Sequence, residues 1–152
     1  LASGDFDYDN LINLFTGNIG GCIGEISTVL LLIGGLFLMA RKVITWHTPF
    51  TFIATVALFS VLFPSNNPPL QYMLAQVMSG GLMLGAFFMA TDYVTSPITN
   101  PGRIAFGIGC GLITVIIRTW GGYPEGVAFS ILIMNALVPL INRATRPRKF
   151  GA

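Results

Sequence analysis

Four charged residues lie inside or at the edge of long apolar stretches of the sequence: Glu25, Asp92, Arg118 and Glu125. Placing a charge in a bilayer costs from about 3 kcal/mol upwards, depending on the scale. An ionisable residue in such a stretch therefore predicts a functional site by default. The three carboxylates are candidates for an ion pathway or for contacts with a bound cofactor.

Asp92 ends an apolar run and is followed by a short polar segment. That segment contains three hydroxyls, an amide and two prolines: Thr95, Ser96, Thr99, Asn100, Pro97 and Pro101. Because proline interrupts helices, we expect irregular backbone whose carbonyls and hydroxyls surround one carboxylate. Such a set suits a cation or the polar edge of a flat heterocycle. The alternative is that Asp92 and Thr95 only cap and punctuate a loop.

The other two carboxylates stand at predicted helix starts. Glu25 follows a glycine-rich stretch, and Glu125 follows Tyr123 and Pro124. A carboxylate is stabilised by the helix dipole at such positions, and proline is favoured in the first turn, so a capping role competes with a functional one. The sequence shows no nucleophile–base pair, no metal-ligand cluster and no phosphate-binding loop. Hydrolysis, phosphoryl transfer and a metal centre are therefore not predicted.

The amino-acid composition indicates that the protein lies in a membrane. Of the 152 residues only 9% are charged and 53% are hydrophobic. A soluble domain carries about 25% charged residues, so lipid must face much of this surface. A net charge of +2, without basic and aromatic residues interleaved on one face, does not indicate nucleic-acid binding. The sequence predicts an all-α integral membrane protein with a single domain over 1–152.

Five membrane-spanning helices are expected, because a span needs about 20 residues. Their ranges are about 24–42, 47–63, 70–91, 102–119 and 125–143. Residues 10–24 precede them and are too glycine-rich to remain one helix, so they predict a re-entrant half-helix with a broken turn. Irregular backbone at membrane depth is tolerated only where protein covers it or where it lines a cavity.

The basic residues set the expected orientation. Arg41, Lys42, Arg103 and the basic tail 144–152 all fall on one side of five spans, and Arg118 is the exception. The positive-inside rule places that side in the cytoplasm, with the N-terminal end outside. The opening LASGDFDYDN lacks the features of a signal peptide.

Glycine pairs four residues apart predict close approach of helices. Gly107 and Gly111 have this spacing in the predicted fourth helix. Small residues at such positions let two backbones come together, so we favour helix packing over a ligand role there.

Three stretches carry a resemblance to a known family. They are GNIGGCIGEIS at 17–27, SGGLMLGAFFMATDYVTSPIT at 79–99 and RTWGGYPEGVAFSILIMNALVPLINRATRPRKFG at 118–151. Together they resemble the D subunit of the Rnf ion-translocating ferredoxin:NAD oxidoreductase complex, whose family includes the B subunit of the sodium-translocating NADH:quinone reductase. The resemblance covers essentially the whole chain. It implies two inverted five-helix repeats of a urea-transporter-like fold, of which this chain resembles the second.

The resemblance also implies cofactors and site residues. Members carry an FMN attached covalently to a threonine and a non-covalent riboflavin. The attachment motif Ser-Gly-Ala-Thr is absent here, so the covalent FMN threonine is expected outside this segment. Asp92 matches the aspartate of the family's Ala-Thr-Asp motif. Thr91, Thr95, Glu25 and Ser27 are the further expected flavin contacts, and Asp92, Glu25 and Glu125 the expected ion pathway. Where many relatives carry an aspartate after Pro-Leu-Ile, this chain has Asn142.

The function implied by the resemblance is electron relay through flavins, coupled to Na⁺ or H⁺ transport. The expected partners are Rnf-type subunits with flavin and iron–sulfur centres, together with the lipid bilayer. The expected location is the bacterial or archaeal cytoplasmic (inner) membrane. Two other functions fit the residues alone: a small-solute channel or transporter of the same fold class, and a passive scaffold for other subunits.

Overall fold

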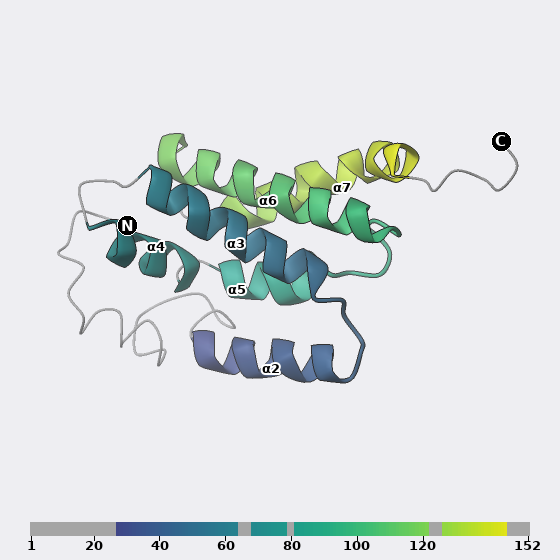
Figure 1. The fold of residues 1–152 in the computed structure, drawn as a ribbon, viewed down its shortest axis with the longest axis horizontal. Helices are drawn as coiled ribbons and strands as arrows, with labels where there is room; N and C mark the ends of the chain where they lie inside the picture. Colours follow the sequence, from purple (N-terminus) through teal and green to yellow (C-terminus); the bar gives the residue numbers. More distant parts are fainter. Residues whose placement is uncertain (1–26, 64–67, 79–80, 122–125, 146–152) are drawn as a thin grey trace, which may run out of the picture.

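The structure is a computed structural model, and it describes residues 27–63, 68–78, 81–121 and 126–145. The described part of the chain is helical throughout its regular structure (Figure 1). Its helices are α2 (Thr28–Ala40), α3 (His47–Leu62), α4 (Pro69–Met78), α5 (Leu82–Leu84), the π-helix η1 (Gly85–Met89), α6 (Asn100–Trp120) and α7 (Gly126–Ala144). The re-entrant half-helix expected over 10–24, and most of the basic tail, lie outside the described residues.

The helices lie side by side, with α3 between α6 and the α5–η1 segment (Figure 1). α7 packs on α6 and also contacts η1, and α2 covers the other side of α5 and η1. One end of the bundle carries the end of α2, the start of α3, the end of η1, the start of α6 and the end of α7. This end is called the basic end below, because Arg41, Lys42, Arg103 and Arg143 belong to it.

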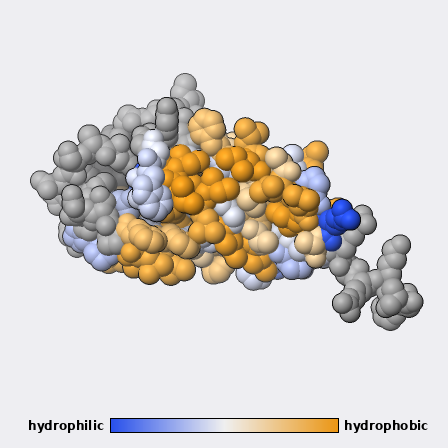
Figure 2. Space-filling model, turned by 90° about the horizontal axis from the view of Figure 1, so that it is seen from above, coloured by the Kyte–Doolittle hydropathy of each residue, from blue (hydrophilic) through white to orange (hydrophobic). Residues whose placement is uncertain are grey.

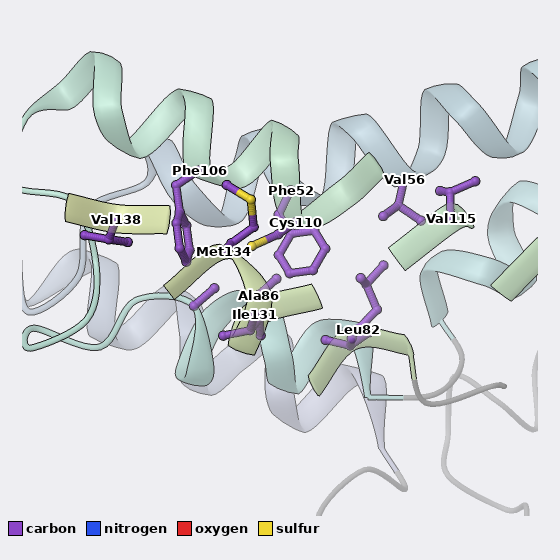
Figure 3. Close-up of a cluster of buried hydrophobic side chains, with 12 residues drawn as sticks. Phe52, Val56, Leu82, Ala86, Phe106, Cys110, Val115, Ile131, Met134 and Val138 are labelled. Carbon is purple, nitrogen blue, oxygen red and sulfur yellow. The ribbon is translucent and has the colours of Figure 1, made fainter. Parts of the chain in front are cut away.

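A small apolar core lies where α3, α5–η1, α6 and α7 meet (Figure 3). Phe52 of α3 and Phe106 of α6 are fully buried, as is Leu82 of α5. Met134 and Ile131 reach this cluster from α7. The four segments are thereby held together by apolar side chains, which fill the space between them.

Glycines bring α3 and α6 close together, which confirms the packing role predicted for Gly107 and Gly111. Both are buried. A Cβ placed at Gly107 would lie 2.9 Å from the carbonyl oxygen of Thr48, and one at Gly111 would lie 2.6 Å from Cβ of Thr55. The faces of α3 and α6 therefore meet at a distance that only glycine allows on the α6 side.

The outer surface is apolar over much of its length, as a lipid-facing surface is. Leu30 and Phe37 of α2 are exposed, and so are Leu132 and Leu140 of α7. Figure 2 shows hydrophobic residues across the middle of one face and the most hydrophilic atoms at the end where α7 ends. Packing against neighbouring helices does not account for this outer surface, but a bilayer does.

Within the described residues, α6 and α7 are long and apolar enough to cross a membrane. α6 has 21 residues, which is about 31 Å of helix, close to the thickness of the hydrocarbon core. α4 with α5–η1 would make a third span if the bent pair is counted as one. α2 and α3 are shorter apolar helices of 13 and 16 residues. These features agree with an all-α membrane protein.

The single helix expected over 70–91 is not observed. α4 ends at Met78, α5 begins at Leu82, and the two parts differ in direction by 60°. Gly81 has φ 66°, a left-handed conformation that interrupts a helix. The sequence Ser79-Gly80-Gly81 explains the break, because each glycine disfavours a helix by about 1 kcal/mol relative to alanine. The apolar run predicted the length of this segment but not its bend.

Candidate functional site

Asp92 lies at the basic end, three residues beyond Met89, the last residue of η1. The π-helix closes with a hydrogen bond of 2.7 Å from the Ala90 N–H to the Gly85 carbonyl, five residues back. Such wide turns are rare in proteins, and many of those that occur lie at functional sites. This turn sets where Thr91 and Asp92 leave the helical segment.

Of the polar residues predicted around Asp92, Thr95 contacts it, and the pair is open to the surroundings. Thr95 Oγ1 donates to Asp92 Oδ2 at 3.3 Å, and the Asp92 side chain is exposed. Thr91 Oγ1 donates to the Phe87 carbonyl at 2.6 Å, within the preceding turn. Asp92 and Thr95 thus form a local pair in a loop, as the capping alternative expects.

The donor and acceptor balance of this group determines which ligand fits it. Both threonine hydroxyls direct their single hydrogen to a protein acceptor, so what remains is acceptor capacity plus the charge of Asp92. Ribityl hydroxyls and the ring N–H of a flavin are donors and would fit this group. Thr91, Asp92 and Thr95 therefore suit a ligand that offers hydrogen-bond donors.

The loop after Asp92 is fastened to two neighbouring elements. The Ile98 N–H donates to Asn142 Oδ1 of α7 at 3.1 Å, and the hydroxyls of Thr99 and Thr145 are 2.6 Å apart. These contacts hold the loop 92–99 against the end of α7. They lie at the place where α6 begins, because Thr99 is the N-cap residue of α6 and accepts from the Gly102 N–H at 3.2 Å.

The same loop also reaches the connection between α2 and α3. The Tyr93 hydroxyl donates to the Val43 carbonyl. Arg103 Nε donates to the Pro97 carbonyl at 3.0 Å, which ties the loop to the first turn of α6. Loop 92–99 is therefore held at positions 93, 97, 98 and 99 by three different elements.

Ser27 does not join this group. It is the N-cap residue of α2, and its hydroxyl accepts from the Leu30 N–H at 3.5 Å. The far end of α2, followed by Val43, is the part that meets Tyr93. Since α2 has 13 residues, Ser27 and Asp92 are separated by about 20 Å of helix. Next to Ser27, Thr28 Oγ1 donates to the Met78 carbonyl at 3.2 Å, where α4 ends.

The remaining predicted carboxylates, Glu25 and Glu125, lie outside the described residues. The described part of the chain contains no group of three or more His, Cys, Asp or Glu side chains that could hold a metal ion. Its only carboxylate side chain is Asp92.

Arg118 lies at the opposite end of the bundle from Asp92. One terminal nitrogen of its guanidinium donates to the Gln76 carbonyl at 2.8 Å and to Gln76 Oε1 at 3.0 Å. Gln76 is buried in α4. The two oxygens of Gln76 accept hydrogen bonds from the Arg118 guanidinium and so partly stabilise its positive charge. From the sequence alone, this cation had no explanation. Sequence reasoning did not single out Gln76.

Two buried polar atoms have no hydrogen-bond partner among the described residues: Nδ1 of His47 and Oδ1 of Asn135. Asn135 stands four residues before Pro139 in α7. Because proline has no backbone N–H, the backbone carbonyl of Asn135 also lacks its usual helical donor. Sequence reasoning missed this position, although an amide four residues before a proline in an apolar helix was a usable signal.

The chain matches the model of the NQR2, RnfD, RnfE family over residues 2–151. It is 53% identical over 142 residues to the D subunit of the Na⁺-translocating ferredoxin:NAD⁺ oxidoreductase complex of Acetobacterium woodii, covering 92% of this chain and 43% of that relative. The D subunit of the ion-translocating oxidoreductase complex of Stutzerimonas stutzeri is 49% identical over 142 residues, which are 93% of this chain and 40% of the relative.

A third relative is the D subunit of the proton-translocating ferredoxin:NAD⁺ oxidoreductase complex of Clostridium ljungdahlii. It is 48% identical over 143 residues, 91% of this chain and 42% of the relative. The chain thus spans about two fifths of the length of each of these relatives.

Proposed function

Since the chain belongs to the NQR2, RnfD, RnfE family, we propose that it forms part of the membrane-embedded D subunit of an ion-translocating ferredoxin:NAD oxidoreductase complex. The observation that carries the proposal is the match to that family over residues 2–151, with about half of the aligned residues identical to each of three D subunits of ion-translocating oxidoreductase complexes, two of them named for ferredoxin and NAD⁺. The apolar helices α6 and α7 support a membrane location.

In this proposal the chain contributes one five-helix repeat of a urea-transporter-like fold to a larger subunit. The N-terminal end faces outward, and the basic end faces the cytoplasm of a bacterial or archaeal cell, in its inner membrane. Support comes from the basic residues, because Arg41, Lys42, Arg103 and Arg143 share one end of the bundle. Its partners are the other Rnf-type subunits, which carry flavin and iron–sulfur centres.

The chain's own role is to hold riboflavin and to line part of an ion path, while a covalent FMN is attached outside this segment. A bound flavin supplies the one- and two-electron chemistry. Asp92 would accept a hydrogen bond from a flavin donor, Thr95 would orient the carboxylate, and Thr91 would offer its oxygen lone pairs. In support of this assignment, Thr95 contacts Asp92, Thr91 precedes Asp92 directly in the chain, and both threonine oxygens keep acceptor capacity.

Flavin content tests the proposal directly. The purified complex that contains this chain is extracted and analysed by mass spectrometry, and its peptides are mapped for FMN-phosphothreonine. The expected result is free riboflavin together with an FMN-modified peptide from outside residues 1–152. An intact complex without any flavin would overturn the electron-relay function and favour the small-solute channel.

A pair of substitutions then isolates the charge of Asp92. Asp92→Asn removes the charge but keeps an oxygen that can accept from Thr95, whereas Thr95→Val removes the hydroxyl and keeps the charge. The ions named for the relatives differ, Na⁺ in one and protons in another, so turnover is measured against Na⁺ concentration and with a protonophore. We expect Asp92→Asn to shift ion-dependent turnover about tenfold or more, and Thr95→Val to shift it less. Identical ion dependence in wild type and Asp92→Asn would remove Asp92 from the ion path.

A further inference from the structure

We propose that the basic end of the bundle binds the phosphate groups of anionic phospholipids, with the loop 93–98 inserted at the membrane interface. The binding surface consists of that loop and four cations, Arg41, Lys42, Arg103 and Arg143. The inference rests on the proposed membrane placement and not on electron transfer.

The loop brings cations from three elements to one surface. Tyr93 bonds to the carbonyl of Val43, the residue after Lys42. Ile98 bonds to Asn142, the residue before Arg143. Arg103 itself bonds to Pro97. The end of α2, the start of α6 and the end of α7 are thereby gathered around one short segment, and each contributes a positive charge.

The charge balance of this surface favours an anion. Asp92 is the only carboxylate in the described part of the chain, against four cations at this end. Arg41, Lys42 and Arg143 are exposed. Arg103 uses Nε for Pro97 and one terminal nitrogen for Asn100 at 3.4 Å, which leaves further N–H groups of its guanidinium for a ligand. Arginine and lysine are the side chains that bind phosphate oxygens.

The apolar part of the surface points to lipid as the source of that phosphate. The side chains of Tyr93, Val94 and Ile98 are 75%, 87% and 79% exposed. Three exposed apolar side chains on a short loop at the end that carries the four cations match the layer where acyl chains meet headgroups. The same end carries Trp46, 59% exposed, and tryptophan and tyrosine are enriched at that layer. A free phosphate ion would not need the apolar tip.

Lys42 offers a way to remove one of these charges without disturbing the end of α2. Its φ is 55°, the left-handed conformation in which helices usually end with glycine. Its N–H donates to the Met39 carbonyl at 2.9 Å, as expected at the end of α2. A glycine would adopt this backbone with less strain. Lys42→Gly therefore removes a charge while preserving, or slightly improving, the end of the helix.

The test uses the detergent-purified complex that contains this chain, delipidated and titrated with dioleoyl phosphatidylglycerol, with dioleoyl phosphatidylcholine as the neutral lipid. Bound lipid is counted by native mass spectrometry. The variant Arg41→Gln/Lys42→Gly/Arg143→Gln removes three charges and leaves Arg103, which holds the loop. The matched control, Arg41→Lys/Lys42→Arg/Arg143→Lys, keeps all three charges.

We expect wild type and the charge-retaining control to prefer phosphatidylglycerol over phosphatidylcholine. Each removed charge should lower the affinity for phosphatidylglycerol about fivefold, from roughly 1 kcal/mol per cation near an anionic surface. Equal phosphatidylglycerol binding by the two triple variants would overturn the proposal. The proposal would also be overturned if the charge-removing variant bound lipid normally but lost another subunit from the complex. The surface would then bind an acidic protein.

Lys42→Gly alone keeps the proposal testable if the triple variant does not assemble. Its phosphatidylglycerol affinity should fall about fivefold at an unchanged thermal midpoint, and an unchanged affinity would count against the lipid site. Flavin content and ferredoxin:NAD turnover are measured on the same preparations. A variant that loses lipid but keeps flavin separates this surface from the proposed redox function.

Discussion

The α3–α6 interface and the loop 92–99 are built on opposite principles, although α6 forms one side of the interface and begins directly after the loop. In the interface, Gly107 and Gly111 lie against Thr48 and Thr55, and no larger residue fits without movement. The loop is exposed at half of its positions and is held by single hydrogen bonds from neighbouring elements. The interface is held by close packing, and the loop is held by a few hydrogen bonds.

This difference separates the parts of the chain that keep the fold from those that can respond to a ligand. A close-packed interface cannot accommodate added volume, because even one extra methyl group forces the backbone or the side chains to move. Single exposed hydrogen bonds can be exchanged for water or a ligand at a net cost of about 1 kcal/mol each. The placement of Asp92 in the second region is consistent with a role in binding.

The largest effect is expected from filling the glycine interface. Gly111→Ala would place a Cβ 2.6 Å from Cβ of Thr55, an atom fixed to the α3 backbone. The separation of α3 and α6 would have to increase, at a cost of about 1–3 kcal/mol. The measurement is the thermal midpoint of the purified complex, together with the amount of complex recovered.

Gly109→Ala on the same helix is the matched control. Its Cβ would meet the terminal methyl and sulfur of Met134, the flexible end of a long side chain. Alanine also favours a helix over glycine by about 1 kcal/mol, so this substitution should be neutral or slightly stabilising. Similar losses for Gly109→Ala and Gly111→Ala would show that the α3–α6 contact is not the limiting one.

The sequence predicted the fold class more successfully than the local geometry. Low charge and long apolar runs predicted an all-α membrane protein, and the four-residue spacing of Gly107 and Gly111 predicted their packing role. Both are local or compositional signals. The bend between α4 and α5 was missed because the run from 70 to 91 is apolar enough for one helix, and hydropathy gives no weight to Ser79-Gly80-Gly81 as a break.

The site was predictable only as far as its residues are neighbours in sequence. The pair of Asp92 and Thr95 lies within three positions, and its residues do lie together. The contacts that hold the loop join residues 50 and 44 positions apart, Tyr93 with Val43 and Ile98 with Asn142. Spacing rules cannot identify such pairs without the packing of α2 and α7. The resemblance grouped Ser27 with Asp92 as a flavin contact, whereas α2 lies between the two residues.

A smaller effect is expected where the loop passes into α6. Thr99→Val removes the hydroxyl that caps α6 through Gly102 and that pairs with Thr145. Loss of an N-cap oxygen costs about 1 kcal/mol, and up to about 2 in unfavourable cases. Thr99→Ser, which keeps the hydroxyl, is the control. Hydrogen exchange of the peptide covering residues 99–103 should accelerate in Thr99→Val and remain at the wild-type rate in Thr99→Ser. Equal rates would mean that Gly102 is capped by water.

The smallest effect is expected at Asn142, and its sign distinguishes two roles for this residue. Asn142→Leu keeps a similar size but removes the acceptor for the Ile98 N–H. Because the Ile98 side chain is 79% exposed, water can replace the lost partner, so global stability should fall by less than about 1 kcal/mol. Exchange of the Ile98 amide should nevertheless become several-fold faster. Asn142→Asp supplies an ionised acceptor, which bonds more strongly than an amide oxygen, so exchange should be as slow as in wild type or slower. If Asn142→Asp instead frees the amide as Asn142→Leu does, the carboxylate prefers another partner, and the nearby Arg143 or a bound cation would be the one to examine.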